Sequence, residues 1–186
     1  MKKLLLLLLA LSICLSLPLL AQEKEAEKKE MSAEEMASMA PPQPLDDEWS
    51  MWMVGEWEGW SQSAQGKTQD WEKISMALGG QFLFAESKTV MGAMTYKGMG
   101  ATTIHPQTGE VVGYWIDNWR GMYKGKGTRE GSKLTMEWHG PTGTYKRTME
   151  KVGDDKYTAT WSYSDPSGNH SEGTSEMTKK PMMTNK

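Results

Sequence analysis

From about Asp46 to Lys180, apolar and polar residues alternate in short segments that end at glycine, proline, asparagine or aspartate. Alternation with a period of two is typical of a β-strand that buries one face. In Lys133–His139, for example, the apolar positions 134, 136 and 138 alternate with polar ones. The pattern predicts ten strands, near Glu56–Gln62, Gln69–Met76, Phe82–Val90, Met94–Ile104, Val111–Asn118, Met122–Arg129, Lys133–His139, Thr144–Val152, Tyr157–Tyr163 and His170–Thr178.

The segments between these strands are short and rich in turn-forming residues. The clearest are "HPQTGE" and "DPSGN", which have proline early and glycine late, as in a turn followed by a left-handed residue. Tight turns without intervening helices make successive strands antiparallel neighbours. Because a meander of ten strands has two exposed edges unless it closes, we expect an all-β fold, a roughly ten-stranded antiparallel up-and-down β-barrel. A β-sandwich is the alternative architecture.

Two segments depart from simple alternation. In "LDDEWSMWMV", acidic residues lead, and Trp49, Trp52 and Met53 follow at i, i+3, i+4 spacing, which predicts a short helix before the first strand. The strand Val111–Asn118 is apolar on both faces. A strand of this kind is packed on both sides, and we expect the N-terminal helix to cover its outer face.

Residues 1–21 have the organisation of a secretory signal peptide. Two lysines precede a mainly apolar run, and Ala21 stands at the small-residue exit before Gln22. We therefore expect cleavage after Ala21 and a secreted or periplasmic protein. A membrane anchor fits less well, because Pro18 interrupts the run and a spanning helix needs about 20 apolar residues. Lipidation of Cys14 is disfavoured by the bulky Ile13 before it.

The remaining chain divides into three parts. Residues 22–45 are charged and almost free of branched aliphatic residues, which predicts a flexible tether; residues 46–180 form the barrel domain, and residues 181–186 a disordered tail. Removal of Lys2 and Lys3 with the signal changes the formal charge from −3 to −5. An acidic chain without a basic block is unsuited to nucleic acid. We expect no nucleic-acid partner and no membrane span.

The stretch "VGEWEGW" places Gly55 and Trp57 at the start of the first strand. This Gly-x-Trp motif is similar to the signature of the calycin and lipocalin-like barrels, in which the tryptophan lies across one end of the barrel beneath a basic side chain of the last strand. The resemblance implies that Lys179 or Lys180 is that basic partner. An indole is a large plug, and a cation over its face adds about 0.5–2 kcal/mol.

A fuller pattern comprises "VGEWEG", "LGGQFL", "GMGATTIHPQTGEVVGYWIDN", "GPTGTYKRTME" and "DDKYTATWSY". In this order these segments resemble the domain of unknown function (DUF) 1579 family of secreted bacterial proteins, from Glu48 to Lys180. The chain departs from that family at Met53, where leucine is expected, and at residues 103–105. The resemblance implies a lipocalin-like barrel and brings no established activity with it.

The aromatic residues of the strands suggest an interior binding site. A barrel of this size can enclose a small apolar or amphipathic molecule. The alternative is that the indoles simply fill the core. Asp117 is the acid we expect to be partly buried, because tryptophans flank it. The candidate ligand-binding residues are Trp57, Trp115, Asp117, Trp138, Trp161 and Tyr163.

We expect no catalysis, no metal and no cofactor. The mature chain would lack cysteine, and no G-x-S-x-G motif or metal-spaced histidine pair is present. Three alternatives stay open: an enzyme using Asp117 with a second acid; a haem protein with His170 as ligand, as the more distant nitrobindin-like barrels imply; and a copper(I) site of methionines. The polar surroundings of His170 and the scattered methionines disfavour the last two, and His105 and His139 are read as solvated.

Overall fold

The computed structural model describes residues 31–32 and 39–181. Among these residues, those from Pro42 onward form one compact unit, which contains the helix and the ten strands. The helix is α3 (Glu48–Met53). The strands are β1 (Gly55–Ser63), β2 (Gly66–Ala77), β3 (Phe82–Met91), β4 (Met94–Ile104), β5 (Val111–Asp117), β6 (Met122–Glu130), β7 (Lys133–Gly140), β8 (Gly143–Lys151), β9 (Lys156–Ser164) and β10 (His170–Lys179).

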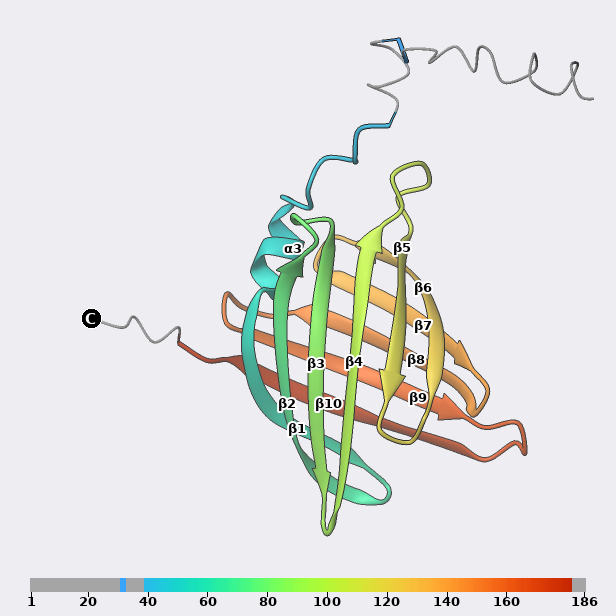
Figure 1. The fold of residues 1–186 in the computed structure, drawn as a ribbon. Helices are drawn as coiled ribbons and strands as arrows, with labels where there is room; N and C mark the ends of the chain where they lie inside the picture. Colours follow the sequence, from blue (N-terminus) through green and yellow to red (C-terminus); the bar gives the residue numbers. More distant parts are fainter. Residues whose placement is uncertain (1–30, 33–38, 182–186) are drawn as a thin grey trace, which may run out of the picture. The chain divides into compact units, whose positions relative to one another are not determined.

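Each strand pairs antiparallel with the next in sequence, and β1 pairs with β10, so the sheet closes into a barrel (Figure 1). The predicted all-β barrel is therefore confirmed, and the sandwich is excluded. All ten predicted strands are present, with bounds that differ by three residues or fewer. The closing register sets Trp57 opposite Lys179, which brings the two ends of the domain together.

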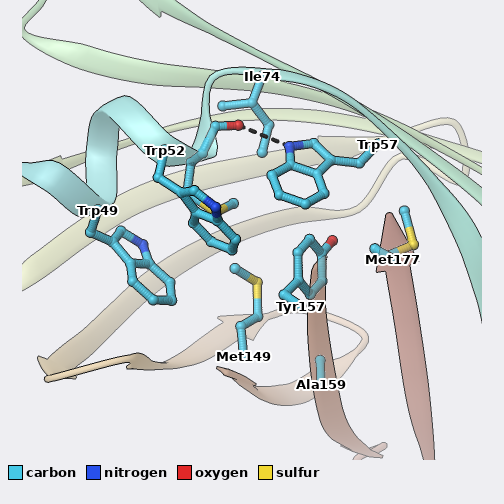
Figure 2. Packing of buried hydrophobic residues seen from close by; sticks show 9 residues of the cluster. Trp49, Trp52, Trp57, Ile74, Met149, Tyr157, Ala159 and Met177 are labelled. Carbon is cyan, nitrogen blue, oxygen red and sulfur yellow. Dashed lines mark hydrogen bonds between the residues drawn. The ribbon is translucent and has the colours of Figure 1, made fainter. Parts of the chain in front are cut away.

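The helix α3 begins as its sequence predicts. Asp47 is its N-cap, and the Asp47 carboxylate accepts hydrogen bonds from the backbone N–H of Ser50 at 3.0 Å and from the Ser50 hydroxyl at 2.6 Å. Such a cap satisfies donors that a helix start leaves unpaired. The spacing of Trp49, Trp52 and Met53 places all three on a buried face, which turns toward one end of the barrel (Figure 2).

Trp57 closes that end of the barrel. Its side chain is fully buried, and its ring lies 5.0 Å from the rings of both Trp52 and Tyr157 (Figure 2). The indole N–H donates to the Met53 carbonyl at 2.9 Å. The Lys179 ammonium lies 5.3 Å from the centre of the Trp57 ring and donates to the Trp52 carbonyl at 2.6 Å. Two carbonyls that the end of α3 leaves free are thus satisfied.

Of the two lysines proposed for this role, Lys179 is the one that lies over Trp57. Burial, with a smaller contribution from Lys151, lowers the pKa of Lys179. Lys180 instead forms an ion pair with Glu58 on the outer surface. We call the end formed by α3 and Trp57 the closed end.

One expectation about α3 is wrong. The helix was expected to cover the outer face of β5, but it packs against the closed end, beside Trp57 and Tyr157. The outward-facing residues Tyr114 and Ile116 of β5 are 64% and 45% exposed. The helix has only six residues, and its two indoles are buried in the core of the closed end.

The predicted signal peptide and most of the predicted tether and tail lie outside the described residues. Within residues 31–32 and 39–181, no helix has the length and apolar character needed to cross a membrane.

We predict that Trp57→Ala lowers the free energy of unfolding by about 3–5 kcal/mol, because it removes a fully buried indole and leaves a cavity. Urea unfolding followed by circular dichroism measures the change. The matched control is Trp119→Ala, because Trp119 is 58% exposed and should change stability by no more than about 0.5 kcal/mol. Equal losses in the two variants would contradict the role assigned to Trp57.

Candidate functional site

A large cavity occupies the barrel interior away from the closed end. Its volume is about 1040 Å³, and its lining reaches the β1–β2, β3–β4, β5–β6 and β7–β8 turns, for example at Gln65, Gly92, Gly121 and Thr142. These turns lie at the end opposite α3 (Figure 1), which we call the mouth. A smaller cavity of about 120 Å³ lies between α3 and the larger one, and Trp115, Trp138 and Arg147 line both. These three side chains therefore separate the two cavities, and Arg147 is the charged group in the floor of the large one.

The cavity wall is largely aromatic. Trp115 and Trp138 lie 6.4 Å apart, and Tyr145 stacks on Trp161 at 6.3 Å. These rings come from strands in which every second residue points inward. The complete set of aromatic residues in the lining is Tyr96, Trp115, Trp119, Tyr123, Trp138, Tyr145, Trp161 and Tyr163.

Glycines on neighbouring strands explain why these rings line the interior instead of filling it. Gly125 pairs with Trp138 and Gly173 pairs with Trp161. A Cβ added at Gly125 would lie 2.3 Å from the Trp138 ring, and one added at Gly173 would lie 2.5 Å from the Trp161 ring. Each indole therefore lies flat over a glycine of the wall, and the centre of the barrel stays open.

Five of the six residues proposed from the sequence line this cavity: Trp115, Asp117, Trp138, Trp161 and Tyr163. The sixth, Trp57, does not, because it belongs to the core of the closed end.

Sequence reasoning missed several lining residues, chiefly Tyr145 and Arg147 on β8. The signal for them was present, since positions 145, 147 and 149 share one face of a predicted strand. A charged residue among apolar ones obscured it.

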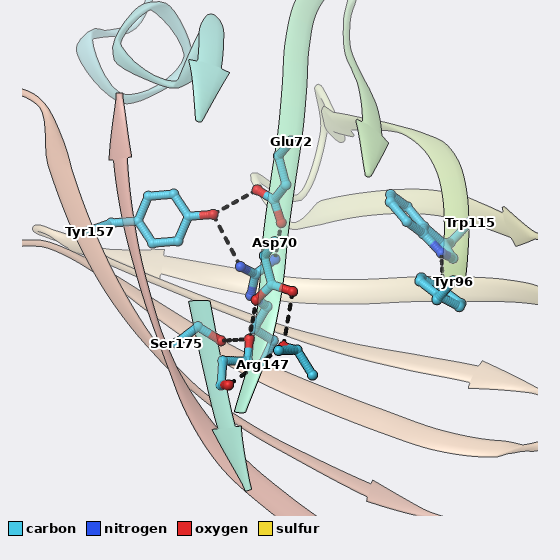
Figure 3. A network of polar contacts seen from close by, with 9 residues as sticks. Asp70, Glu72, Tyr96, Trp115, Arg147, Tyr157 and Ser175 are labelled. Carbon is cyan, nitrogen blue, oxygen red and sulfur yellow. Dashed lines mark hydrogen bonds and ion pairs between the residues drawn. The ribbon is translucent and has the colours of Figure 1, made fainter. Parts of the chain in front are cut away.

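Arg147 is held by a buried polar network (Figure 3). Its guanidinium donates to the Glu72 carboxylate at 2.8 Å and to the Tyr157 hydroxyl at 3.1 Å, and Tyr157 donates to Glu72 at 2.6 Å. The side chains of Arg147 and Glu72 are only 21% and 15% exposed. Burial opposes the charge of Arg147, but attraction to Glu72 outweighs it, and the pKa of Arg147 is raised. The cation is therefore permanent.

A polar strip runs along β1, β2 and β10 (Figure 3). Ser61 donates to Asp70 and lies 2.8 Å from the Ser175 hydroxyl, and Thr68 donates to Asp70 at 3.2 Å. Ser61 and Thr68 also line the cavity. On the far wall, Trp115 donates to the Tyr96 hydroxyl at 2.7 Å. The interior thus offers aromatic faces and one edge of hydrogen-bonding groups.

Asp117 has a structural role at the mouth. One of its carboxylate oxygens accepts hydrogen bonds from the backbone N–H groups of Trp119 at 2.9 Å and Gly121 at 2.7 Å. These bonds fix the turn between β5 and β6, where Arg120 has a φ of 64°. A left-handed backbone at a residue other than glycine needs such support. The presence of an acid here is explained without catalysis.

The three histidines do not point into the cavity. His139 and His170 lie on the outer face, where they contact Glu137 at 2.8 Å and Glu172 at 3.5 Å, and His105 lies in the β4–β5 turn. A haem inside the barrel would find no histidine ligand, so the residues do not fit the haem alternative.

The methionines on strands serve mainly as apolar filler, as Met149 and Met177 do in the closed-end core. Met39 is exposed, and Met36, Met182 and Met183 lie outside the described residues. Among the residues that the structure describes, no cluster of three or more His, Cys, Asp or Glu side chains could hold a metal ion.

A family model described as "Protein of unknown function (DUF1579)" matches residues 46–180. The chain belongs to the DUF1579 family. No curated protein matches it.

Three solved structures that match this DUF1579 chain are the following. The S-type phycobiliprotein lyase CPES from Guillardia theta is 9% identical, covers 72% of this chain and 92% of its own, and has a TM-score of 0.56. A redesigned beta barrel is 9% identical, with 71% and 95% covered and a TM-score of 0.43. The protein EF1p2_mFAP2b bound to DFHBI is 8% identical, with 71% and 96% covered and a TM-score of 0.46. At these identities the likeness to the lyase concerns the fold alone.

The pairing of glycine with indole leads to a first prediction for the cavity. Gly125→Ala forces the Trp138 ring away from the wall and into the interior, because the new methyl group would lie within 2.3 Å of it. We expect a loss of about 1–3 kcal/mol in unfolding free energy and a shift in tryptophan emission. Gly131→Ala is not a suitable control, since Gly131 has a positive φ. The control is Thr160→Ala on the exposed outer face, which should leave the emission unchanged.

The buried network leads to a prediction at alkaline pH. Burial and then the nearby Glu72 carboxylate raise the pKa of Tyr157 well above its usual value. The unfolded chain ionises near pH 10 while the folded Tyr157 stays neutral, so its contribution to stability is present below about pH 10 and is lost as the pH rises further. The slope for one proton is about 1.4 kcal/mol per pH unit.

Tyr157→Phe should therefore make the decline in stability above about pH 10 shallower, although it costs about 1–3 kcal/mol at neutral pH through lost hydrogen bonds. Urea unfolding across the alkaline range measures both effects. Tyr114→Phe is the control, because the Tyr114 side chain is exposed on the outer surface, and it should keep the wild-type slope. If Tyr157→Phe kept that slope as well, the assignment would be wrong.

Proposed function

We propose that this DUF1579 chain is a secreted, non-catalytic barrel that binds one small apolar or amphipathic molecule in its interior. The observation that carries the proposal is the cavity of about 1040 Å³, open at the mouth and closed by α3 at the other end. Cavities that bind small ligands commonly have volumes of about 300–1000 Å³. A packed interior would have offered no such space.

The lining favours a ligand with at least one flat, apolar part. Indole and phenol rings on opposite walls offer faces for stacking, and each such contact contributes about 0.5–1.5 kcal/mol beyond area burial. The polar strip of Ser61, Thr68 and Asp70 offers hydrogen-bond partners for one polar group of the ligand. An amphipathic molecule can satisfy both kinds of surface.

Two parts of the proposal rest on the sequence and the site together. Secretion is supported by residues 1–21, which have the organisation of a signal peptide. The absence of catalysis is supported by the site: the Asp117 carboxylate is engaged by backbone N–H groups, and the Glu72 carboxylate is paired with Arg147. Both acids are accounted for by structural roles.

Binding can be tested with N-phenyl-1-naphthylamine, a neutral and planar fluorescent probe. We expect one probe molecule per barrel, a rise in probe emission and quenching of tryptophan emission. Thr89→Trp should weaken binding about tenfold or more, since Thr89 lines the cavity and an indole there would fill it. The matched control is Thr160→Trp, because Thr160 is exposed on the outer face of β9, and it should bind the probe like the wild type.

Two results would refute interior binding. One is the absence of a saturable probe signal in the folded wild-type protein. The other is equal affinity in Thr89→Trp and the wild type, which would place the probe outside the barrel. Circular dichroism of each variant shows whether the fold is retained.

A further inference from the structure

An uncovered apolar patch lies on the outside of the barrel beside the mouth. It consists of Met99, Tyr114, Ile116, Trp119 and Met122, whose exposed fractions range from 42% to 69%. Met99 pairs with Ile116 across β4 and β5, and Ile116 pairs with Met122 across β5 and β6. Side chains paired directly on one face of a sheet are neighbours, so these three form a continuous row. We call the five residues the apolar patch.

The turn between β5 and β6 extends the apolar patch to the mouth. Trp119 belongs to this turn and also lines the cavity, where its ring lies 5.3 Å from Tyr96. The carboxylate of Asp117 holds the turn, and Arg120 keeps a left-handed backbone within it. The turn therefore presents an exposed indole and an exposed guanidinium at the same point of the rim.

Four cations surround the apolar patch. Lys88 and Lys97 pair directly with each other across β3 and β4, Lys124 pairs with Tyr114, and Arg120 lies in the turn. In the part of the chain that the structure describes, none of the four forms an ion pair. Two acids lie on the same outer face: Glu86 is opposite Met99, and Glu137 is opposite the further cation Lys126. The local charge is thus positive on a chain whose net charge is −3.

This arrangement is unfavourable in water alone. Like charges that face each other across strands destabilise a sheet, and apolar patches of neighbouring residues are uncommon on proteins that lack a partner there. Anionic lipid headgroups would neutralise the lysines, and the layer beneath them would accept the indole and the methionine side chains. Tryptophan favours this interfacial region, and each basic residue near an anionic surface contributes about 1 kcal/mol.

We propose that the apolar patch and its four cations form a docking face for an anionic lipid membrane. Docking in this way brings the mouth of the cavity to the headgroup layer, where an amphipathic molecule could pass between bilayer and barrel. The docking itself does not require an occupied cavity, so it goes beyond the ligand binding proposed above and can be tested separately.

The test is sedimentation of the full chain with vesicles of equal parts phosphatidylglycerol and phosphatidylcholine, compared with vesicles of phosphatidylcholine alone. We expect binding to the mixed vesicles only, and weaker binding as salt is added. In Lys88→Gln/Lys97→Gln, each neutralised lysine should lower the partition coefficient about fivefold. The matched control, Lys133→Gln/Lys146→Gln, removes two exposed lysines on β7 and β8, away from the patch, and should bind like the wild type.

A second pair of variants tests the apolar contribution. Ile116→Ser/Met122→Ser should lower vesicle binding about tenfold, whereas Val152→Ser, at a position that is 52% exposed elsewhere, should not. Neither Ile116 nor Met122 lines the cavity, so binding of N-phenyl-1-naphthylamine should be retained. That retained binding also reports that the double variant is folded.

Three results would overturn the proposal. The first is equal binding to neutral and mixed vesicles, and the second is equal binding by the patch variants and their controls. The third is a dimer of the wild type in analytical ultracentrifugation that Ile116→Ser/Met122→Ser converts to monomer, because the patch would then be a contact between two copies of the chain.

Discussion

The contact between Trp57 and the end of α3 sets the organisation of the whole domain. The indole N–H satisfies the Met53 carbonyl, and Lys179 satisfies the Trp52 carbonyl while lying over the indole ring. One cluster thus joins the helix to the first and the last strand. Because this cluster seals one end of the barrel, the large cavity opens only toward the other end.

The interior stays open because glycines occupy the wall positions beneath the large indole rings. Glycines such as Gly125 and Gly173 let the indoles of Trp138 and Trp161 lie flat against the sheet. Arg147, tied to Glu72 and Tyr157, forms the floor. A buried ion pair of this kind contributes little net stability compared with an apolar core. Its permanent charge instead keeps the floor polar beneath an aromatic wall.

The alternation of side chains sufficed to predict the strands, since a period of two is local and each turn carries its own residues. The Gly-x-Trp motif likewise predicted the closed end. Expectations about contacts between distant strands did less well. Position 147 lies on the inward face of its predicted strand, but the sequence could not show that Glu72, 75 positions away, pairs with an arginine there. The outer cover of β5 was wrongly assigned, because the sequence shows an apolar face but not which element reaches it.

The direction of the strands has a practical consequence. β1 begins and β10 ends at the closed end, where Trp57 faces Lys179, and residues 42–45 approach the same end through hydrogen bonds to Gly80 and Gln81. The links to the rest of the chain therefore leave from the side opposite the mouth. A support or fusion partner attached through those links would leave the opening free, so an immobilised barrel would remain accessible to the ligand proposed above.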